Sequence, residues 1–455
     1  MLKTVVKRAL PALIWFVLGA LLAWYLIPAE LEQMKWEIPG TPDEYPVAQL
    51  MRPFLHCLFC FLPFIGSVIY AFMGTTDRYM TRNFMSFFLM CTFILLLIYL
   101  LADFTDNLER LRNRGGDHAF IGALKFYGSQ LPMILYQILP YTLMMGTMWC
   151  LSKLSGTCEI TGMMQSGRSL LSLCRPIFIF GALISVAYGI FGYHWAPNGM
   201  LYRQMYLKQE RRADGSPAQI FYQSDANSRH WIIQHPASID NPGAPMHKLQ
   251  IKQFDKSMIT IEKRYYADKA VWDKESSIWT LYDVYVHENN ENELKPTDGT
   301  HYDVLPCNFS EKPYQILSPG PGGRIESIGT ADLHEYITSG AGGKEDRYKR
   351  RTEWHVRIAK IFTCMVLVLL AIPSSVTFQR RGTMKGIGIA IILAALMLFL
   401  YRVFPALGEA GVIQAWISAW IPNVVYTIIA IYIFRKNLAH RSLREWFRAR
   451  MKGEM

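Results

Sequence analysis

Long apolar stretches alternate with short polar ones along most of the chain. A helix needs about 20 predominantly apolar residues to cross about 30 Å of hydrocarbon. Eight stretches come close to that length, at residues 10–27, 53–72, 84–101, 131–151, 177–195, 358–378, 387–404 and 416–434. This pattern predicts an α-helical polytopic membrane protein with about eight transmembrane helices.

One long polar region, at about residues 198–351, separates the fifth expected helix from the sixth. Leu249 and Ile251 stand between polar neighbours there, and Ile278 begins a second alternating run. Alternation with a period of two is typical of strands with one buried face. A polar turn at 273–276 between two such runs predicts a hairpin. We therefore expect an inserted all-β domain of the sandwich or jelly-roll type.

Charge sets the expected topology. Charged residues make up only 18% of the chain, whose formal net charge is +11. The basic residues lie beside the ends of the apolar stretches and include Lys3, Lys7, Arg8, Arg78, Arg82, Lys153, Arg168, Arg175, Arg380, Arg381, Lys385, Arg435, Lys436, Arg441 and Arg444. Because lysine and arginine favour cytoplasmic loops, we expect both termini in the cytoplasm and the β domain outside. Because the basic residues lie beside the spans and not together on one polar domain, we expect no nucleic-acid partner.

Candidate metal and nucleotide chemistry is sparse. Cys57 and Cys60 have C-x-x-C spacing, but they lie in an apolar stretch without further ligands, which favours packing over a metal or redox site. Glycines 320–323 lack the strand, helix and lysine of a phosphate-binding loop. We expect no catalytic residue, metal or cofactor in this chain. If ATP drives its function, a separate subunit binds the ATP and Mg.

The sequence gives little support to two rival functions. Histidines of the external region have no H-E-x-x-H spacing, which disfavours a membrane-anchored enzyme. An ion-coupled transporter would place carboxylates in mid-helix, whereas Asp103 and Asp106 stand at the outer end of one expected helix. An ion-coupled transporter and a non-transporting membrane scaffold of the same topology remain the alternatives.

A cytoplasmic segment at 154–168 has the features of a short helix. Thr157 can cap it, Glu159 falls in its first turn and Gly167 can end it. Ile160, Met163 and Met164 then share one face. From periodicity alone, such a helix either presents an adaptable patch to a cytosolic protein or lies on lipid headgroups.

Several motifs resemble one family. The run from Glu159 to Ser169, Glu-Ile-Thr-Gly-Met-Met-Gln-Ser-Gly-Arg-Ser, is similar to the E-[IL]-x-[AV]-[LM]-[RQ]-[AS]-S-G pattern of the LptF/LptG (YjgP/YjgQ) permeases of lipopolysaccharide export. Segments 77–84, 195–199, 353–357 and 420–423 resemble further parts of that family, in the same order. The resemblance covers about residues 77–435. It leaves out the first two expected helices, which could dock a partner, brace the next helix or block one side of a substrate cavity.

The resemblance implies a function for the cytoplasmic segment. It would be the coupling helix, at about 157–167, that docks on a cytosolic ABC ATPase dimer. Glu159 would pair there with a basic residue of the ATPase. The residues assigned to it are Glu159, Ile160, Met163, Met164, Gly167 and Arg168.

The resemblance also implies a transport complex. A second, related permease would complete an LptF/LptG heterodimer in the cell inner membrane. Lipopolysaccharide would be taken up among membrane lipids and passed, for outer-membrane biogenesis, to periplasmic jelly-roll proteins of the LptC/LptA type. Within the family, the sequence of segment 195–199 slightly favours LptG over LptF.

Lipopolysaccharide carries phosphates, so cations near the outer ends of the helices are candidates to bind it. These are Arg110, Arg112, Arg114, Lys125 and Arg402. The alternative is snorkelling of long side chains to the interface, and Glu409 could pair with Arg402.

The expected domains follow from these assignments. They are an N-terminal extension with two extra helices at 1–75, a first transmembrane half at 76–197, a periplasmic β-jelly-roll domain at 198–335, a linker at 336–352, a second transmembrane half at 353–436 and a basic cytoplasmic tail at 437–455.

Overall fold

The computed structural model describes residues 2–37, 47–115, 119–208, 220–224, 228–235, 244–255, 261–273, 278–288, 299–309, 311, 313, 316, 325–339, 344–375 and 383–438. Glycines 320–323 and the tail beyond Leu438 lie outside these residues. The domain boundaries given above stay a prediction.

Long helices form the larger part of the molecule. They are α1 (Leu2–Glu37), α2 (Val47–Phe72), α3 (Thr75–Gly115), α4 (Ala119–Gly156), α6 (Leu170–Ile190), α10 (Lys344–Ser375), α11 (Thr383–Glu409) and α12 (Ala415–Leu438). Seven of them, all except α11, contain a span long and apolar enough to cross a membrane. Seven of the eight expected spans are thus confirmed; most side chains in the first half of α11 lie outside the described residues.

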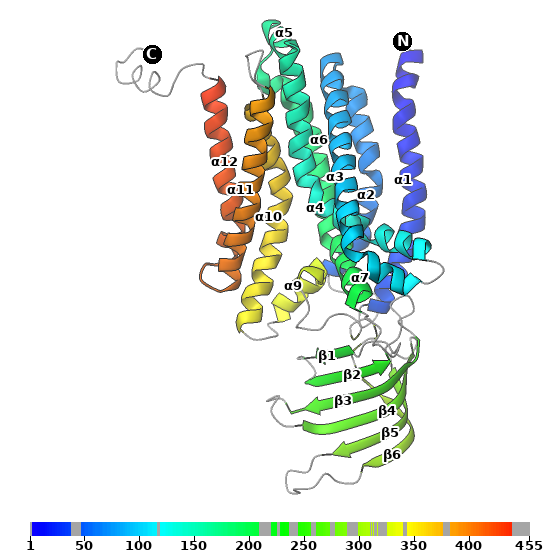
Figure 1. Cartoon of the computed structure of the whole chain (residues 1–455). Coiled ribbons are helices and arrows are strands. Elements are labelled where there is room, and N and C mark those ends of the chain that lie inside the picture. Colours follow the sequence, from blue (N-terminus) through cyan, green and yellow to red (C-terminus); the bar gives the residue numbers. More distant parts are fainter. Residues whose placement is uncertain are drawn as a thin grey trace.

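The ends of the helix bundle differ. The start of α1, the short helix α5 (Glu159–Gln165) and the end of α12 lie at one end, and the β-sheet lies beyond the other (Figure 1). The chain leaves the bundle through a π-helical turn, η3 (Phe191–Trp195), and α7 (Ala196–Lys208). It returns through a 3₁₀ turn, η4 (Ile325–Ser327), and α9 (Thr330–Ser339). This arrangement agrees with the expected placement of the β domain opposite the cytoplasmic segment.

Apolar packing holds the central helices together. One buried cluster joins side chains of α3, α4, α5, α6 and α10, including Phe84, Leu151, Ile177 and Val368. Gly146 lets α4 approach α3 closely, since a Cβ there would lie 2.7 Å from the Phe88 Cα. The core of the bundle is therefore a tightly packed set of helices to which α1 and α2 are added.

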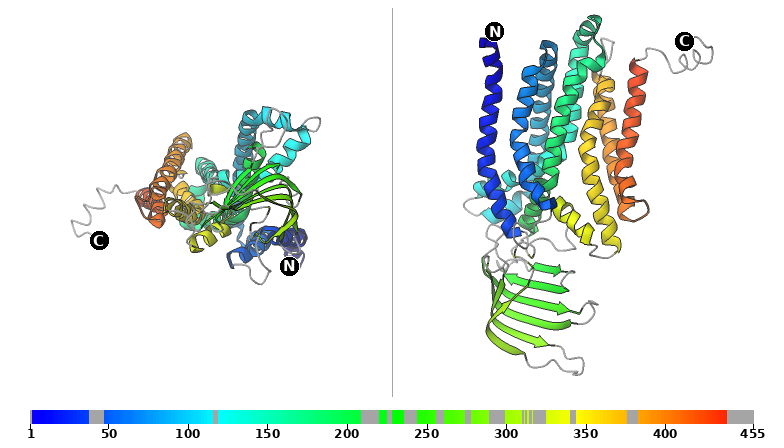
Figure 2. Two further views of the ribbon diagram at one scale, coloured as in Figure 1. Left: turned by 90° about the horizontal axis from the view of Figure 1, so that it is seen from below. Right: turned by 180° about the vertical axis from the view of Figure 1, so that it is seen from behind.

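The N-terminal hairpin of α1 and α2 lies at the edge of the bundle opposite α11 and α12 (Figure 2). Its second helix packs against α6 and α9. Phe59 of α2 contacts Phe191 and Trp195 of the π-helical turn. The hairpin thus adjoins the segments that lead to and from the β domain.

The β domain is a six-stranded antiparallel sheet in the order β1-β2-β3-β4-β5-β6. Its strands are β1 (Ile220–Ser224), β2 (Arg229–His235), β3 (Met246–Phe254), β4 (Ile261–Asp273), β5 (Ile278–Glu288) and β6 (Thr300–Cys307). The inserted all-β domain and the β4–β5 hairpin are confirmed. Consecutive strands are neighbours throughout, so the described strands form a meander, and the crossed connections of a jelly roll are not among them.

One face of the sheet carries the core of this domain. Trp231, Trp279 and Leu281 are buried there, together with Phe309 from the segment after β6. Cys307 lies at the edge of this core, and burial raises the pKa of its thiol to about 11. A thiol in that environment packs as a small apolar group.

Candidate functional site

The predicted coupling segment forms helix α5 at the tip of the bundle. Glu159 accepts a hydrogen bond of 2.6 Å from the Tyr79 hydroxyl of α3 and another of 2.9 Å from the Thr157 hydroxyl. Arg168, just beyond α5, lies 3.9 Å from the carboxylate of Asp77. Two side-chain contacts therefore connect this region to the first turn of α3.

Two details of the segment differ from the sequence-based expectation. The residue at the N-cap is Cys158 in a left-handed conformation, with φ of 60°, and Thr157 bonds to Glu159 without capping the helix. Gly167 has a φ of 84°, which fits its expected place after the helix end.

The apolar face of α5 points inward. Ile160 is only 1% exposed, and Met163 and Met164 pack against the central cluster of the bundle. Ile160 is therefore buried by the neighbouring helices, whereas Met163 and Met164 remain partly exposed. That this face is presented to a cytosolic partner stays a prediction. The exposed residues are Gly162, Gln165 and Ser166 of the opposite face, together with Arg168.

The candidate lipid-binding cations are spread over the half of the bundle nearest the β-sheet. Lys125 on α4 and Arg402 on α11 are both exposed. Arg402 and Glu409, both described, form no ion pair with each other. Arg110, Arg112 and Arg114 lie in α3, but their side chains are outside the described residues.

Lys360 of α10 is a further cation that the sequence analysis missed. It lies within the span of α10, with its Nζ 5.9 Å from the centre of the Tyr136 ring of α4. A cation at this depth is costly, and the face of an aromatic ring compensates part of that cost. The signal available in the sequence was a lysine inside the sixth expected span, at 358–378.

An ionic cluster joins α3, α4 and α7 near the end of the bundle that faces the β-sheet. The Arg203 guanidinium lies 2.5 Å from the Asp103 carboxylate and donates to Gln130 at 3.1 Å. The Tyr127 hydroxyl donates to the other Asp103 oxygen at 3.1 Å. Asp103 therefore serves as an ion-pair partner for the helix that leads to the β domain, a role different from that of a mid-span ion-binding carboxylate.

A second arginine fastens the return connection. Arg357 of α10 pairs with Glu353 and donates hydrogen bonds to the carbonyl oxygens of Ile325, Glu326 and Ile328. It also donates to the Thr330 hydroxyl oxygen at 2.9 Å. Both connections between the helices and the β domain are thus tied to the bundle by an arginine.

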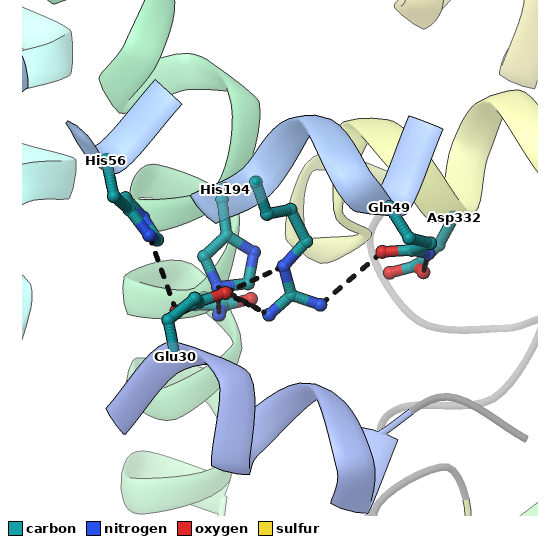
Figure 3. A network of polar contacts seen from close by, with 7 residues as sticks. Glu30, Gln49, His56, His194 and Asp332 are labelled. Atoms are coloured by element: carbon teal, nitrogen blue, oxygen red, sulfur yellow. Dashed lines mark hydrogen bonds and ion pairs between the residues drawn. The ribbon is translucent and has the colours of Figure 1, made fainter. Parts of the chain in front are cut away.

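A buried polar network occupies the junction between the N-terminal hairpin and the rest of the bundle (Figure 3). The Arg52 guanidinium of α2 lies 2.8 Å from the Glu30 carboxylate of α1. Both residues are buried, at 3% and 6% exposure. His56 Nδ1 lies 3.7 Å from the second Glu30 oxygen, and its ring stacks on Trp195.

The same network reaches both connectors. Arg52 Nη2 and Asn198 Nδ2 lie 2.8 and 2.9 Å from His194 Nε2 in the π-helical turn. Since both of these neighbours are donors, Nε2 accepts and the proton of a neutral His194 is on Nδ1. The Gln49 amide donates to Asp332 of α9 at 2.6 Å. Ionisable residues within membrane spans are functional candidates, so His56 in the second apolar stretch, with Arg52 just before that stretch, was the available signal.

A bundle of long apolar helices with an inserted β-sheet defines the chain as a polytopic helical membrane protein. The family model of the lipopolysaccharide export system permease LptF/LptG matches residues 78–436. The chain therefore belongs to the LptF/LptG family, as the sequence motifs indicated, and the N-terminal hairpin lies outside the matched region.

Curated relatives agree with this assignment. The lipopolysaccharide export system permease protein LptF of Escherichia coli K12 is 22% identical over 362 residues, which are 78% of this chain and 93% of that protein. LptF of Shigella flexneri has the same identity and coverage. These relatives are named LptF, so they lend no support to the slight preference for LptG. The family is one of transporter permease subunits of the inner membrane, and it is not catalytic.

Proposed function

We propose that this chain forms half of the membrane channel of an ATP-driven lipopolysaccharide extractor. A second, related permease supplies the other half, and a cytosolic ABC ATPase dimer supplies the energy and binds ATP and Mg. In this proposal both termini and α5 lie in the cytoplasm. The β domain hands the lipid to periplasmic jelly-roll proteins of the LptC/LptA type.

The position of α5 carries this proposal. It is the part of the described chain farthest from the sheet, and its buried face joins the same apolar cluster as α3, α4, α6 and α10. A push on α5 is therefore transmitted to several long helices at once. The Tyr79–Glu159 bond adds a direct polar link to α3.

The inward packing of Ile160, Met163 and Met164 changes how the ATPase would be bound. An ATPase would contact the exposed side of the helix, with Gln165 and Arg168, and the partly exposed Glu159. Glu159 would then exchange its bond with Tyr79 for a basic residue of the ATPase. The methionines would pass the resulting displacement on to the bundle.

The test is affinity purification of the full-length protein from its native membrane in mild detergent. Glu159→Ala is compared with Tyr79→Phe, which removes the internal bond and keeps the carboxylate. We expect wild type and Tyr79→Phe to recover an ATPase and a second permease, with ATP hydrolysis stimulated by purified lipopolysaccharide. Glu159→Ala should lose that stimulation. Recovery of no ATPase with wild type would refute the extractor and favour the scaffold.

Cations of the outer half would attract the lipid phosphates. Arg402 and Lys360 are the best placed, because α11 and α10 adjoin each other and the polar contact between Tyr401 and Thr363 sets them at one depth. Arg402→Gln and Lys360→Gln should each raise the lipopolysaccharide concentration needed for half-maximal stimulation of ATP hydrolysis. Lys263→Gln, in the β domain, is the matched control and should leave that concentration unchanged.

A further inference from the structure

The N-terminal hairpin contacts both chain segments that connect the bundle to the β domain. On the outgoing side, Arg52 lies 2.8 Å from His194, and the Tyr193 hydroxyl donates to the Ala48 carbonyl oxygen at 2.5 Å. On the returning side, Gln49 bonds to Asp332 at 2.6 Å. One short stretch of α2 therefore touches both connectors.

The two connectors also touch each other at this point. The Thr330 hydroxyl of α9 donates to the Gly192 carbonyl oxygen of the π-helical turn at 3.1 Å. A Cβ on Gly192 would lie 2.5 Å from a ring atom of Tyr136, so the turn is also held close to α4. The hairpin thus closes a junction of four segments, at the level where the chain leaves the helices.

Buried charged side chains hold this junction together, although apolar packing would stabilise it equally well. Moving a carboxylate and a guanidinium out of water is costly, and a well-packed apolar pair is often at least as stable. What a buried pair adds is geometry, because only one arrangement places Arg52 against Glu30 and His194 together. The network therefore specifies where the hairpin sits against the connectors.

We propose that the N-terminal hairpin is a clamp that sets the position of the β domain relative to the membrane helices, with Arg52 as its positioning residue. For lipid transfer this rests on the proposed function, since a lipid leaving the bundle must meet a correctly placed sheet. The clamp itself is a property of the chain and can be tested without transport.

The experiment measures the distance between the two parts of the full-length protein in lipid nanodiscs. Spin labels are placed at Asp268→Cys on β4 and Glu409→Cys at the end of α11, both exposed. In the background, the exposed Cys158 and the half-buried Cys57 are replaced by serine. We expect a narrow distance distribution for wild type. Arg52→Met should broaden it and shift its maximum by several ångströms.

Two further variants separate positioning from folding. Glu30→Leu/Arg52→Met removes the buried charges together, so it should stay folded and still broaden the distribution. Glu32→Gln, two residues from Glu30 on the exposed side of α1, is the matched control and should match wild type. A double variant that is folded and keeps the wild-type distribution would overturn the clamp.

A second measurement distinguishes this proposal from the transport function. In the assembled transporter, a photoreactive residue on the buried face of the sheet is cross-linked to purified lipopolysaccharide. Arg52→Met should lower the cross-linked fraction several-fold while ATP hydrolysis persists. If wild type itself cross-links no lipid but the distances still broaden, the clamp stands and the transport function fails. If cross-linking and distances both stay at wild-type levels in Arg52→Met, the clamp fails.

Discussion

The two extra helices and the central helices of the region matched by the family model are held in different ways. In the family region, α4 and α10 are buried over most of their apolar spans by the neighbouring helices. In α1, most of the span is exposed. Its described contacts are mainly with α2, and they include the ion pair of its buried Glu30. The core is therefore stabilised along its length, whereas the hairpin is positioned mainly from one end.

This difference teaches how a helix pair can be added to an existing bundle. Lipid is as apolar as leucine, so an apolar face alone gives little preference for one docking position over another. A buried ionic network satisfies that need because it fits in one place. The hairpin's charges thus supply what extended packing supplies in the core.

The largest expected effect comes from breaking that network. Arg52→Met leaves Glu30 buried without its ion-pair partner, which typically costs ~3–5 kcal/mol. Glu30→Leu/Arg52→Met should recover most of this loss. The measurement is the midpoint of thermal denaturation in detergent, with Glu32→Gln as control. A double variant as unstable as the single one would show that the pair contributes net stability.

In the core, the corresponding weak point is a close contact between backbones. Gly146→Ala would place a Cβ 2.7 Å from the Phe88 Cα, and backbone atoms cannot move aside cheaply. We expect a loss of ~1–3 kcal/mol, measured by the same denaturation midpoint. Gly128→Ala on the same helix meets nothing within 4 Å and is the matched control. Equal midpoints for the two variants would contradict tight packing of α3 on α4.

The same substitution in the hairpin should cost less. Gly19→Ala would bring a Cβ within 2.7 Å of the Cys60 carbonyl oxygen, which resembles the clash in the core. Yet α1 can shift outward, because many of its side chains are exposed and, among the described helices, its packing is mainly against α2. We expect a loss of up to about 1 kcal/mol. A loss as large as that of Gly146→Ala would mean that α1 is as firmly confined as α4.

The smallest effect is expected where the hairpin joins the core along the chain. Arg78 donates to the carbonyl oxygens of Tyr70 and Ala71 at 3.2 and 2.9 Å, which caps the end of α2 from the start of α3. These bonds are largely accessible to solvent, so Arg78→Ala should cost ~0–1 kcal/mol. If Arg78→Ala altered the thiol labelling of Cys57, the hairpin contacts would be lost in this variant. That result would show that the end of the hairpin next to α3 matters for its position as much as the end with the buried network.

Much of the architecture was predictable from the sequence because it depends on local pattern. Apolar length gave the spans, alternation gave the strands of the inserted domain, and Gly167 marked the end of α5. The inward packing of Ile160, Met163 and Met164 was not predictable, since a seven-residue helix shows which residues share a face but not which way that face turns. That depends on how far the neighbouring helices extend.

The polar network was beyond sequence reasoning for a similar reason. Arg52 is separated from Glu30 by 22 positions and from His194 by 142. Each residue could be noticed alone as a charge or imidazole near a helix end. Their meeting depends on the depth and rotation of three helices, which side-chain packing decides.

The π-helical turn at Phe191–Trp195 changes the direction in which the following side chains leave the helix. An α-helix rotates by about 100° per residue, and a π turn contains about one residue more than an α turn. Side chains after the turn are therefore rotated about the helix axis relative to the side chains before it. Tyr188 stacks on Tyr136 of α4, whereas His194 and Asn198 meet the hairpin network. One continuous helical rod thus serves two sets of neighbours, and deleting a single residue from the turn would swing His194 away from Arg52.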